Sequence, residues 1–288
     1  MPDPSGRRPG PKRPPVNVEA TRLESDEEIR QAILARQARQ QGKAPAAGAA
    51  VPVAAPAEPD TPPETPQQRP RLAMLCILDD GKHDGEWVRL RAERYLIGRA
   101  DGDIRIPHDV LMSSRHAEIV RQPTRDGHRW VLVDLDSTNG TWVRIGGTAL
   151  RPDNELLVGR GQYRFEAGAA AAEEPASPAD STRAWGGPAI TALVPSLVEV
   201  TPAGPGPRVP LTQAEYWIGR DPRACAIARP DDPFVNPRHA RLFRDAKGQW
   251  HVENNRSVNG LWLRVDEIPL GTTCQLRMGE QRFLFRVL

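Results

Sequence analysis

The chain contains an internal repeat, and this feature constrains its fold more than any other. Four short motifs occur twice in the same order: YLIGR and YWIGR, SSRHAEI and NPRHARL, STNGTWVR and SVNGLWLR, and YRFE and FLFR. Arg99 and Asn139 lie 40 positions apart in the first copy, and Arg220 and Asn259 lie 39 positions apart in the second. Ordered motifs at matched spacing indicate that one domain has been duplicated.

Both copies have the texture of an all-β domain. Runs of about four to seven apolar and β-branched residues alternate with Gly, Asp and Asn, which is typical of short strands joined by turns. The sequence therefore predicts an all-β protein with one β-sandwich over residues 71–167 and a second over residues 191–288.

The residues outside the two copies have a different composition. Residues 1–70 are rich in Pro, Ala, Gln and charge and contain no Phe, Trp or Tyr, so we expect a disordered tail. Within the tail, Ser25 and the acidic residues after it predict a short helix over residues 24–40, with too few apolar residues for independent stability. Residues 168–190 resemble a flexible Ala/Pro/Ser-rich linker.

Charge and cysteine content argue against several classes of protein. The 39 basic and 37 acidic residues give a net charge of +2, so no global field favours nucleic acid or an anionic membrane. Three widely spaced cysteines without a CxxC pair argue against a zinc site or a disulfide framework. No signal peptide or membrane-length apolar run is present. We expect a cytoplasmic protein without metal or cofactor, and neither a membrane nor nucleic acid is an expected partner.

The repeated motifs carry side chains that suit an anion. In the first copy these are Arg99 after a glycine, the pair Ser113 and Ser114, and Thr138 and Asn139 at a turn. An arginine fork, hydroxyl groups and the N–H groups of a turn together suit the oxygens of a phosphate. No nucleophile and base with matching roles accompany them, and no Walker loop or kinase signature is present. The motifs therefore predict a binding site without catalytic residues.

The Asn-Gly pairs also have a simpler interpretation. Alternating apolar residues flank Asn139-Gly140 in LVDLDSTNGTWVRI, which is typical of a β-hairpin with a tight turn. This interpretation explains Gly140 and the strands, but it does not explain Ser137, Thr138 or the recurrence of the turn in NNRSVNGLWLR. Together with the other motifs, the pattern favours a peptide-contacting role for Asn139.

The motifs GR, SxxHA and STNGT, in this order, resemble those of the forkhead-associated (FHA) domain family. The resemblance covers two segments, residues 71–167 and 191–288. It implies a sandwich of about eleven strands that binds phosphothreonine peptides through loops at one end. It further implies that Arg99 and Ser113 hold the phosphate with help from Ser114. Thr138 would line the pocket wall, and Asn139 would hydrogen-bond the peptide backbone.

The same resemblance assigns supporting roles and a weaker second site. Gly98 and Gly140 would permit the turns, and His116 would brace the loops from behind. A structural role is favoured for this histidine over catalysis or metal binding, because no second ligand is suitably spaced. The second copy has the equivalent residues Arg220, Asn236, His239, Val258 and Asn259. Asn replaces a serine and Val replaces a threonine there, so this site has lost a hydroxyl donor.

The sequence thus predicts a non-enzymatic adaptor that acts with Ser/Thr kinase signalling. The first domain would be the phosphothreonine reader, and the partners would be phosphothreonine-containing substrates of Ser/Thr kinases. The alternative is a phosphate-independent scaffold that uses the faces of the sandwiches. A further hypothesis is that Thr21, in an acidic context, is phosphorylated and loops back onto the first domain.

Overall fold

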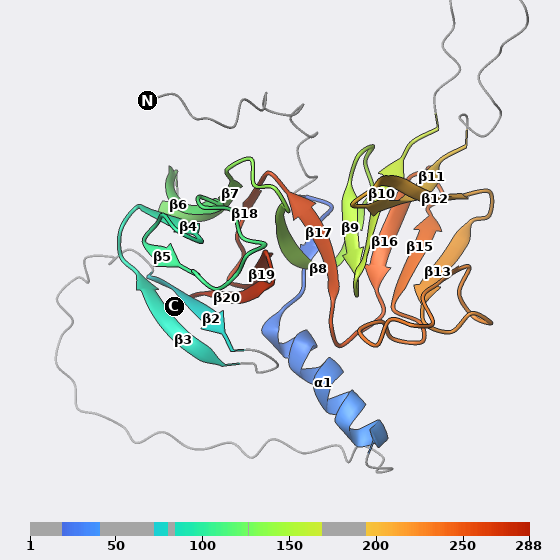
Figure 1. The fold of residues 1–288 in the computed structure, drawn as a ribbon, viewed down its shortest axis with the longest axis horizontal. Coiled ribbons are helices and arrows are strands. Elements are labelled where there is room, and N and C mark those ends of the chain that lie inside the picture. The colour runs from blue at the N-terminus through green and yellow to red at the C-terminus, as the bar shows by residue number, and fades with distance from the viewer. Residues whose placement is uncertain (1–18, 41–71, 80–83, 126, 169–193) are drawn as a thin grey trace, which may run out of the picture.

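A computed structural model describes five parts of the chain, namely residues 19–40, 72–79, 84–125, 127–168 and 194–288. Apart from one helix, their regular structure is strands, as expected (Figure 1). No helix in these parts is long and apolar enough to cross a membrane. The three cysteines, Cys76, Cys225 and Cys274, are buried free thiols.

In the described residues the strands follow the two repeats along the chain, with nine in the first and ten in the second, where the resemblance implies about eleven each. Those of the first repeat are β2 (Ala73–Leu78), β3 (Gly85–Leu90), β4 (Arg94–Gly98), β5 (Ile104–Arg105), β6 (Ala117–Thr124), β7 (Gly127–Asp134), β8 (Thr141–Ala149), β9 (Glu155–Val158) and β10 (Gly161–Glu166). Those of the second are β11 (Ser196–Thr201), β12 (Gly204–Pro210), β13 (Glu215–Gly219), β14 (Ile227–Ala228), β15 (Ala240–Arg244), β16 (Trp250–Asn254), β17 (Leu261–Val265), β18 (Glu267–Pro269), β19 (Thr273–Met278) and β20 (Gln281–Val287).

The two repeats exchange strands. One sandwich, here called the first sandwich, combines β2–β7 of the first repeat with β18–β20 of the second. Its strand β2 pairs with β20, with Leu75 opposite Phe285, and its strand β7 pairs with β18, with Leu132 opposite Ile268. The first sandwich is therefore incomplete without the last strands of the chain.

The second sandwich shows the reciprocal exchange. It combines β9 and β10 of the first repeat with β11–β16 of the second. Strand β10 pairs with β11 over five consecutive residues, from Gln162 opposite Val200 to Glu166 opposite Ser196. The linker between the repeats thus joins two neighbouring strands of one sheet.

Strands β8 and β17 form a crossing pair that connects the two sandwiches (Figure 1). Strand β8 pairs with β19 of the first sandwich at its start and with β16 of the second sandwich at its end. It stays extended through Gly146 and Gly147, where a glycine pair would ordinarily favour a turn. Because the chain does not reverse there, the end of each repeat reaches the other sandwich. This arrangement differs from the expectation of two sandwiches built from residues 71–167 and 191–288.

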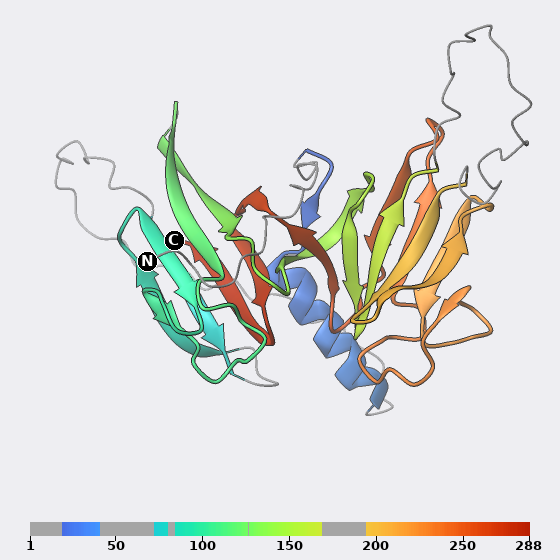
Figure 2. The same cartoon turned by 45° about the horizontal axis from the view of Figure 1, so that its top comes forward.

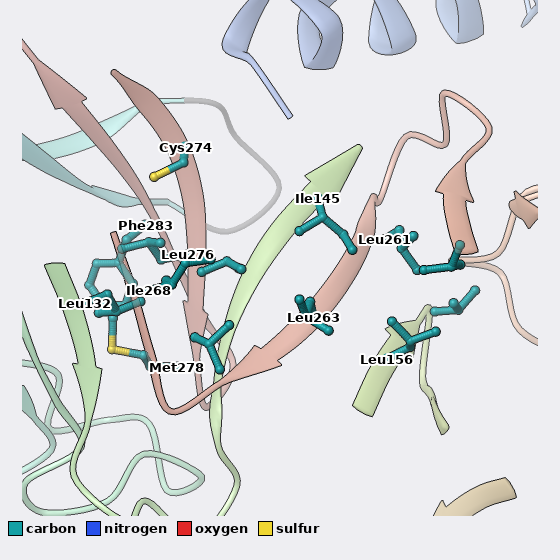
Figure 3. Close-up of a cluster of buried hydrophobic side chains, with 14 of the residues drawn as sticks. Leu132, Ile145, Leu156, Leu261, Leu263, Ile268, Cys274, Leu276, Met278 and Phe283 are labelled. Carbon is teal, nitrogen blue, oxygen red and sulfur yellow. The ribbon is translucent and has the colours of Figure 1, made fainter. Parts of the chain in front are cut away.

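The hydrophobic core runs through the crossing pair without a break. Figure 3 shows Ile145 and Leu263 of the crossing pair between Phe283 on the side of the first sandwich and Leu156 on that of the second. All four side chains are fully buried. Since one core serves both sandwiches, we expect them to unfold together.

The segment before the first repeat packs against the crossing pair. Strand β1 (Arg22–Leu23) pairs with β8, and helix α1 (Asp26–Gln40) lies between the two sandwiches (Figures 1 and 2). Ser25 caps the helix by accepting a hydrogen bond from the backbone N–H of Glu28, and Ile29 faces the core. The expectations of disorder for residues 1–18 and 41–70, and of flexibility for nearly all of the linker, fall outside the described residues.

Candidate functional site

The three motifs of the first repeat meet at one end of the first sandwich. Strand β4 pairs antiparallel with β6, and β6 pairs antiparallel with β7. The end of β4, the start of β6 and the end of β7 therefore lie side by side. These ends carry Arg99, Ser113 with Ser114, and Thr138 with Asn139, so the structure brings the expected residues into one loop cluster.

Ser113 joins the other two loops of this cluster. Its carbonyl oxygen accepts a hydrogen bond from the backbone N–H of Arg99 at 2.9 Å. Its side-chain Oγ accepts one from the backbone N–H of Thr138 at 3.1 Å. The arginine, the serine hydroxyl and the threonine are consequently held within a few ångströms of one another.

Two further hydrogen bonds fix the rim of the cluster. Asn139 Nδ2 donates to the carbonyl oxygen of Leu111 at 2.7 Å, which ties the Asn-Gly turn to the loop before β6. Ser114 Oγ donates to a carboxylate oxygen of Asp101 at 3.2 Å, so this hydroxyl faces the loop that begins with Arg99. Both Asn139 and Ser114 are exposed to solvent.

His116 lies buried behind the cluster and braces two of its loops. Its Nδ1 accepts a hydrogen bond from the N–H of Ser113 at 3.0 Å. Its Nε2 therefore carries the proton and donates to the carbonyl oxygen of Gly140 at 3.2 Å. Burial lowers the pKa of His116, and this effect outweighs the Gly140 hydrogen bond and the nearby acidic groups, which raise it. The neutral imidazole is the form that makes both hydrogen bonds.

Two glycines are needed where the loops approach one another. A Cβ atom at Gly98 would overlap the carbonyl oxygen of Ser114, so only glycine allows the first loop to lie against the second. Gly140 has φ of 78°, the left-handed conformation that completes the tight turn after Asn139. The cluster therefore rests on backbone positions that the motifs specify.

The chemistry of this cluster suits an incoming anion. Arg99 is exposed, and within the described residues its guanidinium has no hydrogen bond or ion pair. A phosphate beside it would also meet the hydroxyl of Ser113 and the side chains of Ser114 and Thr138. In the described parts of the chain, no three His, Cys, Asp or Glu side chains are grouped to hold a metal ion.

The second sandwich repeats this framework. The N–H of Arg220 donates to the carbonyl oxygen of Asn236 at 2.9 Å, and Asn259 Nδ2 donates to the carbonyl oxygen of Phe234 at 2.8 Å. His239 accepts from the N–H of Asn236 at 3.2 Å and donates to the carbonyl oxygen of Gly260 at 2.9 Å. The loops of this second site are thus supported by the same bonds as those of the first.

The second site differs in the groups that would face a ligand. Within the described residues, the side chain of Asn236 makes no hydrogen bond to the turn, whereas the equivalent Ser113 Oγ accepts from Thr138. Val258 replaces Thr138 and is half-buried. The framework is therefore retained while the potential phosphate contacts have changed.

Several supporting residues were not identified from the sequence. Asp109, beside the first site, accepts hydrogen bonds from the N–H groups of Glu280 and Gln281 and so ties the loop before β6 to the β19–β20 hairpin. Asp134 accepts from the N–H and the hydroxyl of Ser137. The Asp-Leu-Asp-Ser spacing at Asp134 is a readable turn signal, but the contact of Asp109 depends on strand exchange and has no local signal.

Comparison with known proteins gives one family. Residues 95–159 and 216–280 each match the family model described as the FHA domain. The protein FhaB of Mycobacterium tuberculosis, an FHA domain-containing protein, is 33% identical over 103 residues, which cover 29% of this chain and 64% of the relative. FhaB of Mycolicibacterium smegmatis is 33% identical over 75 residues, which cover 26% of this chain and 46% of the relative. The chain thus spans less than two thirds of the length of these relatives.

Solved structures give further matches. One, described as a structural and functional analysis of phosphothreonine-dependent FHA domain interactions, is 17% identical and covers 75% of this chain and 95% of its own, with a TM-score of 0.28. Another is Mycobacterium tuberculosis EmbR in complex with a low affinity phosphopeptide. It is 25% identical and covers 33% of this chain and 24% of its own, with a TM-score of 0.21.

Proposed function

Because the chain belongs to the FHA domain family, whose members are phosphothreonine-binding modules, we propose that its first site reads phosphothreonine peptides. The chain would act as a non-enzymatic adaptor. The observation that carries this proposal is that Arg99, whose backbone N–H is bonded to Ser113, is exposed and has no ionic partner within the described residues.

Each residue of the first site has a role in this proposal. Arg99 and Ser113 hold the phosphate, and Ser114 assists from the adjacent position. Thr138 lines the pocket wall. Asn139, already fixed by its bond to the carbonyl oxygen of Leu111, presents its side chain to the peptide backbone.

The partners that fit this site are proteins phosphorylated on threonine, which are substrates of Ser/Thr kinases. Such an adaptor would act in the cytoplasm, where these kinases and their substrates meet. The site recognises a phosphorylated side chain and its flanking backbone, so it links a kinase's product to the next step without changing it chemically.

The second site would bind the same class of ligand more weakly. Val258 offers no hydroxyl where Thr138 offers one, and Asn236 has a different reach from Ser113. Losing one hydrogen bond to a charged group costs about 1.5 to 3 kcal/mol, or roughly ten- to a hundredfold in affinity. Arg220 and Asn259 remain, so weakened binding is expected rather than none.

The crossing pair fixes the separation of the two sites. Strands β8 and β17 pair antiparallel, with Thr141 opposite Val265 and Ile145 opposite Leu261, so their Asn-Gly turns lie at opposite ends of the pair. Gly140 and Gly260 each lie one position before the five paired residues, so about six strand positions separate them, which corresponds to roughly 20 Å. A partner with two phosphothreonines would have to match this distance, because the linker does not set it.

Calorimetry with one peptide in its phosphorylated and unphosphorylated forms tests the proposal. We expect binding only to the phosphorylated form. Arg99→Ala should weaken it more than a hundredfold, since a bidentate contact of two charge-assisted bonds is worth about 3 kcal/mol or more. Arg220→Ala is the matched control, and it should leave the stronger of the two binding events unchanged. Binding indifferent to phosphate and to Arg99→Ala would favour the alternative, a phosphate-independent assembly scaffold.

A further inference from the structure

Two equivalent arginines lie beneath the two sites in a crossed arrangement. Arg144 of the first repeat lies under Gly260 of the second site, and Arg264 of the second repeat lies under Gly140 of the first site. A Cβ atom at either glycine would overlap the guanidinium below it. Each Asn-Gly turn is therefore supported by a charged group from the other repeat.

The positive charge of Arg264 is neutralised by a carboxylate of the first repeat. Its Nη1 donates to a carboxylate oxygen of Glu155 at 3.0 Å. The residue equivalent to Glu155 in the second repeat is Gln275, because Leu156 pairs with Leu263 just as Leu276 pairs with Val143. Gln275 accepts a hydrogen bond from Arg144 at 3.3 Å but carries no charge. The second repeat has thus lost the carboxylate that would neutralise Arg144.

The N-terminal segment supplies the missing carboxylate. Glu24, which directly follows β1, forms an ion pair with the Nε of Arg144. The two side chains are only 5% and 2% exposed, so this is a buried pair. Burying an arginine this deeply without an anionic partner would strongly destabilise the folded protein. Glu24 therefore neutralises the arginine beneath the second site, as Glu155 neutralises the arginine beneath the first.

Glu24 also holds the loop of the second site from its other side. Its second carboxylate oxygen accepts a hydrogen bond from Asn254 Nδ2 at 2.6 Å. Asn254 Oδ1 in turn accepts from the N–H of Ser257 at 3.2 Å. Arg144 donates to the carbonyl oxygens of Ser257 at 3.0 Å and Val258 at 3.2 Å. Arg144 and Asn254, which both hold the turn before Asn259, are therefore both bound to the carboxylate of Glu24.

The segment is attached through several contacts besides Glu24. Strand β1 extends the sheet at β8, and Thr21 Oγ1 lies 2.8 Å from Thr148 Oγ1. Ile29 and Ala32 of α1 are buried. The structure shows no equivalent segment at the first site among the described residues, where Asp134 itself binds the turn through Ser137 and Thr141.

From these contacts we propose that Glu24 is a positioning residue of the second peptide site and that the docked segment, residues 21–35, is part of that site. The proposal rests on the proposed function, in that it takes the turn at Val258 and Asn259 as peptide-contacting. Loss of the Glu24 contacts would therefore weaken peptide binding at the second site and leave the first site unchanged. The two sites then respond differently to the same event.

The central test is Glu24→Gln in the full chain. Backbone amide NMR signals of Val258, Asn259 and Gly260 should shift or broaden, while those of Thr138 and Asn139 should not. Affinity of the second site for a phosphothreonine peptide, measured in an Arg99→Ala background, should fall about tenfold or more, as expected for a charged contact. Affinity of the first site, measured in an Arg220→Ala background, should be unchanged.

A charge-relocation variant separates positioning from general destabilisation. Adding Gln275→Glu to Glu24→Gln places a carboxylate where the first site has Glu155, and it should restore both the amide signals and the affinity. Glu155→Gln is the matched control and should disturb only the first site. The proposal is wrong if Glu24→Gln leaves the second-site amides unchanged, if it weakens both sites equally, or if Gln275→Glu fails to restore them. If the wild-type second site binds no phosphopeptide, the proposed function of that site fails, while the amide signals still decide the role of Glu24.

Discussion

The two loop clusters of this chain share one framework and differ in the groups they present. His116 and His239 make the same pair of hydrogen bonds, and Asn139 and Asn259 tie the same turn to the same neighbouring loop. What differs is the set of polar groups that face outward, in particular Thr138 against Val258. The geometry of such a site can therefore be retained while its ligand contacts change, because different residues provide the two.

The supports beneath the clusters extend the same comparison. Each turn rests on an arginine from the other repeat, but Arg264 is neutralised by Glu155 and Arg144 by Glu24. The first site is completed by strands of the second repeat, and the second site by strands of the first repeat and by the N-terminal segment. Neither repeat contains everything that its own site requires.

Removing residues 266–288 should have the largest effect, although none of the motif residues of the first site is deleted. These residues form β18–β20, which complete the first sandwich with the buried side chains of Leu276, Phe283 and Phe285. Burying each contributes about 1.5 to 3 kcal/mol, so their combined loss approaches the total stability of an ordinary domain. We expect phosphopeptide binding at the first site to be lost, as measured by fluorescence anisotropy. We also expect the truncated chain to lose its cooperative unfolding transition.

A reconstitution experiment is the control for this deletion. Residues 266–288 added as a separate peptide should restore binding, since the missing strands would refill the same positions. Retained binding in the truncated chain would show instead that residues 71–167 fold on their own, as the sequence predicted.

Much of the first site could be predicted because its determinants are local. The positions of Arg99, Ser113 and Thr138 at strand ends follow from short motifs, and antiparallel neighbours bring such ends together. The glycines at 98 and 140 are likewise specified by the turns in which they lie. The types of side chain and their order in the sequence were sufficient to place these residues in one loop cluster.

The strand exchange could not be predicted for an equally physical reason. Val143 and Leu263 are similar apolar residues in equivalent strands, as are Leu156 and Leu276. Alternating patterns specify which face of a strand is buried, but they do not distinguish pairing within a repeat from pairing between repeats. The ion pair of Glu24 and Arg144 joins residues far apart in sequence, and only a comparison of Glu155 with Gln275 would have pointed to it.

The two buried histidines should give the sites different sensitivity to acid. Burial, together with the charge of Arg144, lowers the pKa of His239 to about 4, although the Gly260 hydrogen bond and Asp232 raise it. Burial and the charge of Arg264 also lower the pKa of His116, but two acidic neighbours, Asp134 and Asp109, raise it. The unfolded chain takes up these protons near pH 6.5, before the folded protein does, so stability is lost as pH falls from about 6.5 towards 4. The loss from His239 is on the order of 3 kcal/mol.

Proton NMR titration of the two imidazoles checks this prediction. His239 should titrate at a lower pH than His116, and His239→Gln should remove part of the acid dependence of unfolding. The prediction is wrong if the His116 and His239 imidazoles titrate together near pH 6.5.

Exchanging the hydroxyl groups should have a smaller and more local effect. Thr138→Val copies the second site into the first and should weaken phosphopeptide binding about tenfold, the effect of one lost hydrogen bond to a charged group. Asn236→Ser with Val258→Thr copies the first site into the second, and it should strengthen binding there by a similar factor when measured in an Arg99→Ala background. Because Thr and Val have nearly the same shape, melting temperatures should change little. No change in either affinity would mean that these side chains do not contact the phosphate.

Cleaving the linker should have the smallest effect. A protease site placed between residues 169 and 193 would separate the repeats covalently, but β10 and β11 on either side pair through five consecutive residues, and each fragment completes the other's sandwich. Only the entropy of closing that connection is lost, and this cost grows slowly with loop length. The two fragments should elute together in gel filtration at micromolar concentration and retain first-site affinity. Fragments that separate under native conditions would show that each repeat folds alone. The first sandwich would then not need the strands β18–β20 of the second repeat.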